Sequence, residues 1–351
     1  MKKHWYTYLL AIVGALLLGN CAKNDVLNPE PGTDIARAVP ISFKGSYVDH
    51  ATTRHSCALR DHLPTMGVWG WCTSQADSCT AVFTDQAVVY NPDSARWEYS
   101  PLKYWRQGCQ YNFHAYAPHH GQTTAQVSID TLTHMISIKD VTLHGHNLQQ
   151  TPTDSVKELF RGTPDTDWMI DRNGQTATGV AGMDVEFNMQ HILAKLNIRI
   201  RVCPDVLDRP HLDYITADSI SVSKLPAKGH FTQKLTHTPI TGNPEEAAIE
   251  EWTALAPQLR LRCTNGCTLK STPTYLIESL LIPHQTDEAS RVVLHYTLRF
   301  TDGHTEQCRY RLPLSQAFTR FVSGYSHTLT LTICSDRITF EAGASDWIRE
   351  Q

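Results

Sequence analysis

The sequence has no large excess of charge of either sign and no apolar run long enough to cross a membrane. Its 351 residues include 31 Lys and Arg against 35 Asp and Glu, which gives a formal net charge of -4 at pH 7. A charge so nearly balanced argues against a surface that binds nucleic acid. The apolar run from Tyr8 to Leu18 is shorter than the roughly 18 residues that a transmembrane helix requires.

The sequence also lacks the short motifs that mark common catalytic and nucleotide-binding sites. It contains no GxSxG, HExxH, Walker A or GxGxxG motif. The acidic residues of PDTDWMIDRNG (164–174) do not have the spacing of a calcium loop. We interpret His114, His119 and His120 as solvated loop residues rather than metal ligands. We therefore expect a protein that is not an enzyme and that needs no metal or other cofactor.

The N-terminus has the features of an export signal. Two lysines precede the apolar run, and small and polar residues then lead to Cys21 in LGNC. This ending resembles the lipobox of bacterial lipoproteins, in which the cysteine is acylated, although Asn20 stands where Ala, Gly or Ser is usual. An acyl chain holds a protein to a membrane without spanning it. We predict a signal peptide at 1–20 and a lipid on Cys21; the alternative is ordinary signal cleavage nearby, with Cys21 as a plain thiol.

The cysteines predict disulfides. If Cys21 carries lipid, nine of the ten cysteines remain, and pairing is their default state in an oxidising compartment. Cys72 with Cys79, and Cys263 with Cys267, are close enough in sequence to pair. The second pair has CxxxC spacing and no following helix pattern, so we interpret it as a hairpin disulfide rather than a redox motif. The odd count leaves one thiol free or shared with another chain.

Short alternating segments predict an all-β fold. Residues 22–38 are polar, with two prolines and no periodicity, so residues 21–38 form a flexible tether or propeptide. Residues 141–182 lack alternation and contain the domain boundary. We predict one β-sandwich domain at 39–178 and a second at 179–351. The expected strands lie near 39–47, 66–71, 80–90, 96–100, 111–118, 133–140, 183–202, 218–225, 229–235, 274–283, 291–300, 308–314, 325–333 and 337–342.

The segment VEFNMQHILAKLNIRIRV (185–202) changes its apolar face in the middle. Large apolar residues occupy odd positions from Val185 to Leu193 and even positions from Leu196 to Val202. Because successive side chains of a strand point to opposite faces, the change needs an extra residue, in a β-bulge or where the chain passes between sheets. We interpret the segment as the first strand of the second sandwich, contributing to both of its sheets.

Three segments, taken in order, resemble the fimbrillin family, the subunits of the type V pili of Bacteroidota. WEYSPLKYWRQGCQYNFHAYAPHH (97–120) is similar to the family's W-x-Y-S, Y-W pair, glycine and Y-x-F-x-A-Y-x-P. The strand at 185–202 resembles its F-x-x-x-H-x-L-A-K-L. FVSGYSHTLTLTI (321–333) and ITFEAGASDW (338–347) resemble its closing G-x-x-Y-x-x-x-L-x-L pair and terminal D-W.

The resemblance implies two transthyretin-like β-sandwich domains in tandem, in an outer-membrane lipoprotein that assembles with other fimbrial subunits at the cell surface. In this family a trypsin-like protease cuts after an arginine near the N-terminus, and the groove that opens accepts a strand from a neighbouring subunit. The matching residues are Arg37 in DIARAV, whose cleavage would remove only the tether, and Arg54 in ATTRHS, whose cleavage would free the first strand. The donor would be the C-terminal strand, with Arg337, Ile338, Phe340 and Trp347.

A surface lipoprotein that binds glycans and never polymerises is the alternative function. Exposed aromatic faces would favour it, and the candidates are Trp69, Trp71, Trp97 and Trp105. We expect these four residues in the core and at the edges of the sandwich instead, where aromatic residues commonly lie. The sequence leaves open a shaft, accessory, tip or anchor role, the arginine that is cut, and any host ligand.

Overall fold

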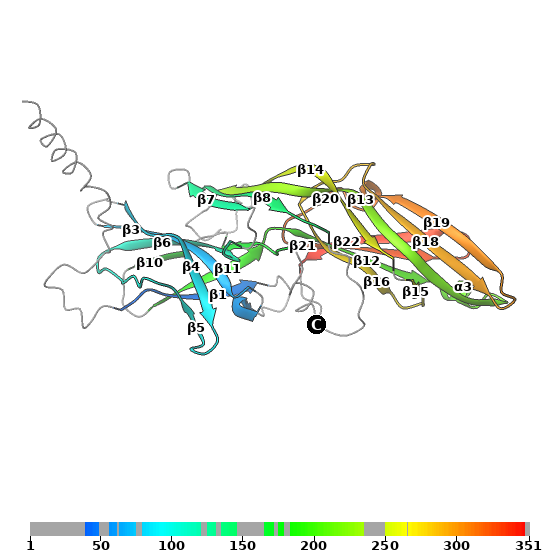
Figure 1. Cartoon of the computed structure of the whole chain (residues 1–351), viewed down its shortest axis with the longest axis horizontal. Helices are drawn as coiled ribbons and strands as arrows, with labels where there is room; N and C mark the ends of the chain where they lie inside the picture. Colours follow the sequence, from blue (N-terminus) through cyan, green and yellow to red (C-terminus); the bar gives the residue numbers. More distant parts are fainter. Residues whose placement is uncertain are drawn as a thin grey trace, which may run out of the picture.

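The computed structural model describes residues 39–48, 56–61, 63–74, 79–120, 125–130, 135–145, 165–171, 175–178, 183–234, 250–264 and 266–347. Nearly every regular element in these ranges is a strand, which confirms the all-β prediction. Their helical elements are single turns, namely η2 (Leu59–Asp61), α3 (Pro204–Leu207) and η4 (Leu314–Gln316). The sheets form two groups, which follow one another along the long axis of the molecule (Figure 1).

The first group is a nine-stranded sheet with the order β2-β1-β11-β9-β6-β3-β4-β5, in which β10 also pairs with β6. Only β1 and β11 run parallel among its described pairs. The strands are β1 (Ser42–Val48), β2 (Ser56–Ala58), β3 (Thr65–Thr73), β4 (Cys79–Asn91), β5 (Arg96–Glu98), β6 (Gln110–Ala117), β9 (Met169–Asp171), β10 (Gln175–Thr178) and β11 (Asp184–His191).

This sheet curves around its own core. Phe43 of β1 packs against Phe83 of β4 with ring centroids 5.3 Å apart, although these strands lie near opposite ends of the strand order. Phe113 of β6 and Phe187 of β11 are fully buried in the same cluster. The alternating apolar residues of each strand therefore face inward on both sides of one core.

The second group is a sandwich of a seven-stranded and a four-stranded sheet, with the orders β19-β18-β13-β8-β7 and β16-β12-β21-β22. Strands β14 and β15 also pair with β13, and β17 pairs with β20 alone. The strands are β7 (Gln126–Asp130), β8 (Met135–Thr142), β12 (Ala194–Val202), β13 (Leu212–Lys234), β14 (Glu250–Cys263), β15 (Cys267–Thr268), β16 (Thr274–Leu281), β17 (His284–Gln285), β18 (Arg291–Phe300), β19 (Thr305–Pro313), β20 (Arg320–Phe321), β21 (Tyr325–Ile333) and β22 (Ile338–Asp346).

The change of face within residues 185–202 marks the passage of the chain from one sheet to another. β11 ends at His191 in the nine-stranded sheet, and β12 begins at Ala194 in the four-stranded sheet. Ile192 and Leu193, between the two strands, are fully buried. The passage between sheets is as predicted, but the segment is two strands rather than one, and only β12 belongs to the sandwich.

β13 changes its buried face twice along its length. It buries Ile215 and Ala217, then Ile220 and Val222, and then odd-numbered residues from Leu225. Each change coincides with an irregularity in its pairing with β18 or β14, because a bulge adds one residue to the strand. The two strands expected at 218–225 and 229–235 are therefore one continuous element, and β7 and β14 lie outside the expected strands.

Hydrogen-bonded sheets cross the predicted domain boundary at 178/179. β7 and β8 precede the boundary in sequence, but β8 pairs with β13 in the sandwich. β11 follows the boundary but pairs with β1 and β9. Trp69 and Tyr116 from the first group, together with Trp168 just before β9, join the core cluster of the sandwich. The division into 39–178 and 179–351 stays a prediction.

A disulfide that the sequence did not identify joins Cys203 to Cys334. β12 and β21 are parallel and pair Val202 with Ile333, so the cysteines that follow these two residues meet at the end of the sheet. The four cysteines expected to pair, Cys72, Cys79, Cys263 and Cys267, are thiols in this structure, and so are Cys109 and Cys308. Both pairings expected from the sequence stay predictions.

Candidate functional site

β1 lies between two strands, and a third segment holds the residues that precede it. Its two edges pair with β2 and β11. The N–H of Ile41 donates to the carbonyl of Lys103 (2.8 Å), and the N–H of Trp105 donates to the carbonyl of Val39 (3.2 Å). The hydroxyl of Tyr99 donates to the carbonyl of Ile41 (2.7 Å). Backbone pairing therefore holds the start of this strand on both sides.

Phe43 anchors β1 in the core of the first sheet. Its side chain is 3% exposed, and its ring centroid lies within 6.0 Å of those of Phe83, Tyr99, Phe113 and Phe187. Ile41 is also buried, whereas a Cβ atom at Gly45 would lie 2.7 Å from Cδ2 of Leu59. Burial of one Phe side chain contributes about 1.5–3 kcal/mol. Residues 41–45 thus place an isoleucine, a phenylalanine and a glycine in turn on the buried face, with the phenylalanine packed among aromatic rings.

The outward side chains of β1 bind the acidic start of β11. Nζ of Lys44 lies 2.7 Å from Oδ2 of Asp184 and 3.7 Å from Oε1 of Glu186, and the hydroxyl of Ser42 donates to Oδ1 of Asp184. The hydrogen bond from Lys44, followed by that from Ser42, lowers the pKa of Asp184. The same bond raises the pKa of Lys44. Both side chains are accessible to solvent, so dissolved salt weakens the ion pair between Lys44 and Asp184.

The expected lipidation and processing residues lie outside the described residues. Cys21 and Arg37 precede Val39, and Arg54 falls in the sequence between β1 and β2. Their order along the chain nevertheless fixes what each cut would do. A cut after Arg54 would separate β1 from everything that follows it, whereas a cut after Arg37 would leave β1 attached.

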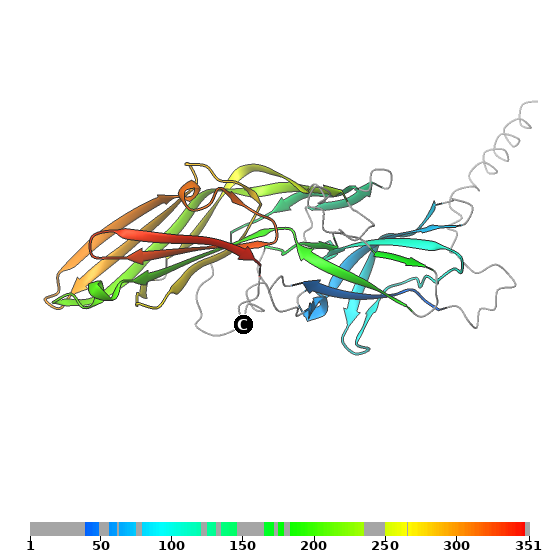
Figure 2. The same cartoon turned by 180° about the vertical axis from the view of Figure 1, so that it is seen from behind.

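β22, the expected donor strand, occupies an edge of the four-stranded sheet of its own chain (β21 and β22 are red in Figure 2). It pairs antiparallel with β21 along its whole length. Ile338 and Phe340 are half-buried against the sandwich core, and Arg337 is exposed. Oε1 of Glu341 accepts a hydrogen bond from Nη2 of Arg201 (3.0 Å). A role as donor would require β22 to leave this edge.

Trp347 fixes the end of β22. Its ring is 5% exposed and stacks on His191, with centroids 4.1 Å apart and planes inclined by 13°. Its backbone N–H donates to the carbonyl of Gly324 (3.0 Å). Nδ1 of His191 lies 2.9 Å from Oδ2 of Asp167, which is itself buried. His191 is therefore a core histidine, as its position on the inward face of its strand predicts, and it supports Trp347.

The four tryptophans considered as a glycan platform do not share an exposed face. Trp69 and Trp71 are only 5% and 8% exposed. Trp97 packs edge-on against Tyr90, and Trp105 packs edge-on against Tyr111. All four are core or edge residues, as expected, so the feature that favoured glycan binding is absent from the described residues.

Comparison with known proteins identifies a family and solved structures that resemble this chain. The sequence profile of a family described as fimbrillin-like matches residues 61–347. The structure is similar to that of a fimbrial protein from Bacteroides vulgatus ATCC 8482, with 15% identity, 88% of this chain and 99% of that chain covered, and a TM-score of 0.59. Candidate cell adhesion proteins from Bacteroides ovatus ATCC 8483 and Bacteroides uniformis ATCC 8492 are also similar, each with 15% identity; they cover 90% and 89% of this chain and 99% of their own, with TM-scores of 0.49 and 0.46. No curated protein matches the sequence.

The matched range runs from η2 to the tryptophan that follows β22 and therefore covers most of the chain. It contains all three segments on which the sequence resemblance depends. None of the helices in the described ranges has the length and hydropathy that a bilayer crossing requires. The chain belongs to the fimbrillin-like family, which makes it a fimbrial subunit rather than an enzyme.

Proposed function

We propose that this chain is a fimbrial subunit that is exported as a lipoprotein, with its lipid on Cys21. It assembles by strand exchange after cleavage at Arg54. In this scheme the cut releases β1, and β22 of a neighbouring copy takes its place beside β11. An extended strand added to an open sheet edge gains backbone hydrogen bonds, and its alternate side chains fill pockets. An accessory, tip or anchor position in the fimbria is compatible with the same chemistry.

The observation that supports this proposal is the correspondence between β1 and β22. The segment ISFKG (41–45) precedes and enters β1, and ITFEA (338–342) opens β22. Both have an isoleucine, a phenylalanine and then a small residue at alternate positions; in β22 the first two are half-buried and Ala342 is exposed. Both also carry a hydroxyl residue between the first two. Since Asp184 accepts a hydrogen bond from Ser42 in β1, Thr339 can make the equivalent bond after exchange.

Phe340 would carry most of the specificity of the exchange. After removal of β1 it would occupy the position of Phe43, between the rings of Phe83, Phe113 and Phe187. A groove left without this side chain is a cavity, and loss of a buried Phe costs about 3–5 kcal/mol in comparable cores. Cleavage without exchange would therefore leave a destabilised subunit. Binding of a donor strand would restore the lost stability.

The test is an assembly assay on the purified chain treated with an arginine-specific protease. We expect a new N-terminus at His55 and heat-labile ladders of higher mass on gels. Arg54→Ala should abolish both, while Arg37→Ala should retain both. Phe340→Ala should be cut normally but should form at least tenfold less ladder; Phe300→Ala, which truncates another half-buried phenylalanine of the sandwich, is the matched control.

Several outcomes would contradict this scheme. Ladders that form without any cut, or after a cut at Arg37 alone, would show that β1 need not leave. An uncut monomer from the cell surface whose mass shows an acyl chain on Cys21 would indicate an anchor or a lipoprotein that never polymerises. A Cys21 without lipid would remove the lipoprotein step and leave the exchange to be judged by the ladders.

A further inference from the structure

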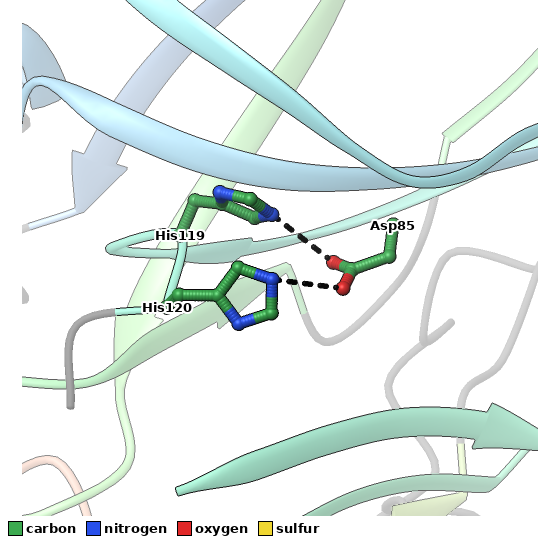
Figure 3. Close-up of side chains that lie close together, drawn as sticks. All are labelled: Asp85, His119 and His120. Atoms are coloured by element: carbon green, nitrogen blue, oxygen red, sulfur yellow. Dashed lines mark ion pairs between the residues drawn. The ribbon is translucent and has the colours of Figure 1, made fainter. Parts of the chain in front are cut away.

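Two adjacent histidines and an aspartate converge at the end of β6, away from β1 and β22. Nε2 of His119 lies 3.5 Å from Oδ1 of Asp85, and Nε2 of His120 lies 3.3 Å from Oδ2. Figure 3 shows both imidazole rings directed at the one carboxylate. The three ligand atoms lie within 4.8 Å of one another. Neither strand exchange nor the core requires this arrangement.

A β-bulge in β4 presents the aspartate. Gln86 pairs with Val68 and Phe83 pairs with Gly70, so two residues of β4, Thr84 and Asp85, face a single residue of β3. Asp85 has a positive φ of 50°, a conformation that Asp and Asn adopt more readily than most residues. Bulges of this kind redirect a side chain out of the regular alternation.

Neighbouring residues hold the histidines and the carboxylate in place. The hydroxyl of Tyr116 donates to Oδ1 of Asp85 (2.9 Å), and the backbone N–H of His119 donates to Oγ1 of Thr65 (3.2 Å). At Gly67 of β3, a Cβ atom would lie 2.1 Å from the ring of Tyr116 and 2.9 Å from that of His119. The absent side chain therefore makes room for both rings, and Tyr116 orients the carboxylate as outer partners of metal ligands do.

Each histidine nitrogen approaches a different oxygen of the Asp85 carboxylate, at a distance close to the spacing between metal ligands. Both nitrogen–oxygen distances exceed the usual length of a charge-assisted hydrogen bond. In a tetrahedral zinc site with bonds of about 2.0–2.1 Å, neighbouring ligand atoms lie about 3.3–3.4 Å apart. Nε2 of His119 is also buried, and its contact with Oδ1 of Asp85 at 3.5 Å does not have the geometry of a hydrogen bond. His120 is 56% exposed at its side chain, so water can complete the coordination.

We propose that Asp85, His119 and His120 bind a borderline divalent cation of the Zn²⁺ class, which ties the end of β6 to the bulge of β4. Two imidazole nitrogens and one carboxylate oxygen suit Zn²⁺, Ni²⁺ or Cu²⁺, whereas Ca²⁺ and Mg²⁺ prefer oxygen ligands throughout. The site is independent of strand exchange, so it can hold whether or not the chain polymerises.

The test is calorimetric titration of the untagged full chain with Zn²⁺ alone at neutral pH. We expect one equivalent whose affinity falls at least tenfold in His120→Gln, since loss even of an outer partner of a metal site costs that much. Asp85→Asn should weaken binding similarly while keeping the positive φ and the Tyr116 bond. Zn²⁺ should also raise the melting temperature of the wild type more than that of either variant at the same Zn²⁺ concentration.

His304→Gln is the matched control, because His304 is an exposed histidine that lies 3.8 Å from a carboxylate oxygen of Glu306. It should bind Zn²⁺ as the wild type does. Equal Zn²⁺ binding by the wild type and His120→Gln would overturn the proposal, and so would an equal loss in His304→Gln. Binding of Ca²⁺ with equal affinity at the same residues would overturn the assignment of the cation class.

Discussion

At the scale of single residues, the bond between Lys44 and Asp184 makes the hold on β1 dependent on pH. The folded state lowers the pKa of Asp184, so its contribution to stability is present at neutral pH. That contribution is lost as the pH falls below the ordinary value of 3.8 and through the lowered pKa. The raised pKa of Lys44 means that its contribution persists below 10.5 and is lost only above this value.

We therefore expect Asp184→Asn to lower the urea midpoint of unfolding at pH 6–8 and to lose this effect in acid. The difference from the wild type should shrink steadily as the pH falls below about 4, and added salt should reduce it. Asp213→Asn, which removes an exposed carboxylate on β13, is the control. A difference that stays constant between pH 3 and pH 7 would show that the carboxylate charge is not involved.

Residues that meet through distant parts of the chain were beyond prediction from the sequence. The sequence groups His119 and His120 with His114, but both faces of β6 are buried from Phe113 onward, so His114 is 1% exposed and packs against Trp71. The partner of the two histidines is instead Asp85, which only the bulge in β4 turns toward them. The Cys203–Cys334 disulfide was not predictable for the same reason, because spacing along the sequence favours pairs of nearby cysteines.

At the scale of the element, Glu341 distinguishes β22 from the strand that it would replace. In its own chain it accepts a hydrogen bond from Arg201. After exchange it would take the position of Lys44, opposite Asp184 and Glu186, where like charges on neighbouring strands repel. Its charge thus favours the resting edge over the exchanged one.

Glu341→Lys should therefore increase the rate of ladder formation by protease-treated protein several-fold. The change removes the bond to Arg201 and restores the charge that Lys44 provides in β1. Glu251→Lys, the same change at an exposed position of β14, should leave the rate unaltered. Slower assembly of Glu341→Lys than of Glu251→Lys would contradict the register in which Phe340 replaces Phe43.

Strands were predictable wherever alternation was unbroken, as in β6, β18 and β21. Apolar residues at every second position mark these strands in the sequence, although β6 and β21 are buried on both faces along much of their length. Prediction failed where extra residues interrupt the pattern. The sequence predicts two strands for β13 because its buried face changes at its bulges. It predicts one strand for 185–202 because a change of apolar face is compatible with a bulge within one strand as well as with a passage between sheets.

At the scale of the whole molecule, the Cys203–Cys334 disulfide links the end of β12 to the connection between β21 and β22. The bridge spans 131 residues of sequence. Cross-links that close loops of this length stabilise by roughly 2–5 kcal/mol, chiefly by restricting the unfolded chain. It also fixes the connection between β21 and β22 while leaving β22 itself outside the closed loop.

We expect the double variant Cys203→Ser/Cys334→Ser to lose about 2–5 kcal/mol of unfolding free energy, measured by urea titration without reductant. Cys79→Ser, which changes an exposed thiol, should have little effect. A comparable loss in Cys79→Ser would instead support the Cys72–Cys79 bridge expected from the sequence. An unchanged double variant would mean that the cross-link does not form in the protein tested.

The likeness of β1 to β22 has a kinetic consequence for the proposed assembly. While β1 remains part of the same chain, it competes for the groove as a tethered ligand, whose effective concentration is on the order of millimolar for a short linker. A neighbour's β22 competes only at the concentration of free subunits. Peptide-bond cleavage at Arg54 would end this intramolecular competition, so the protease rather than the supply of subunits would set when growth begins.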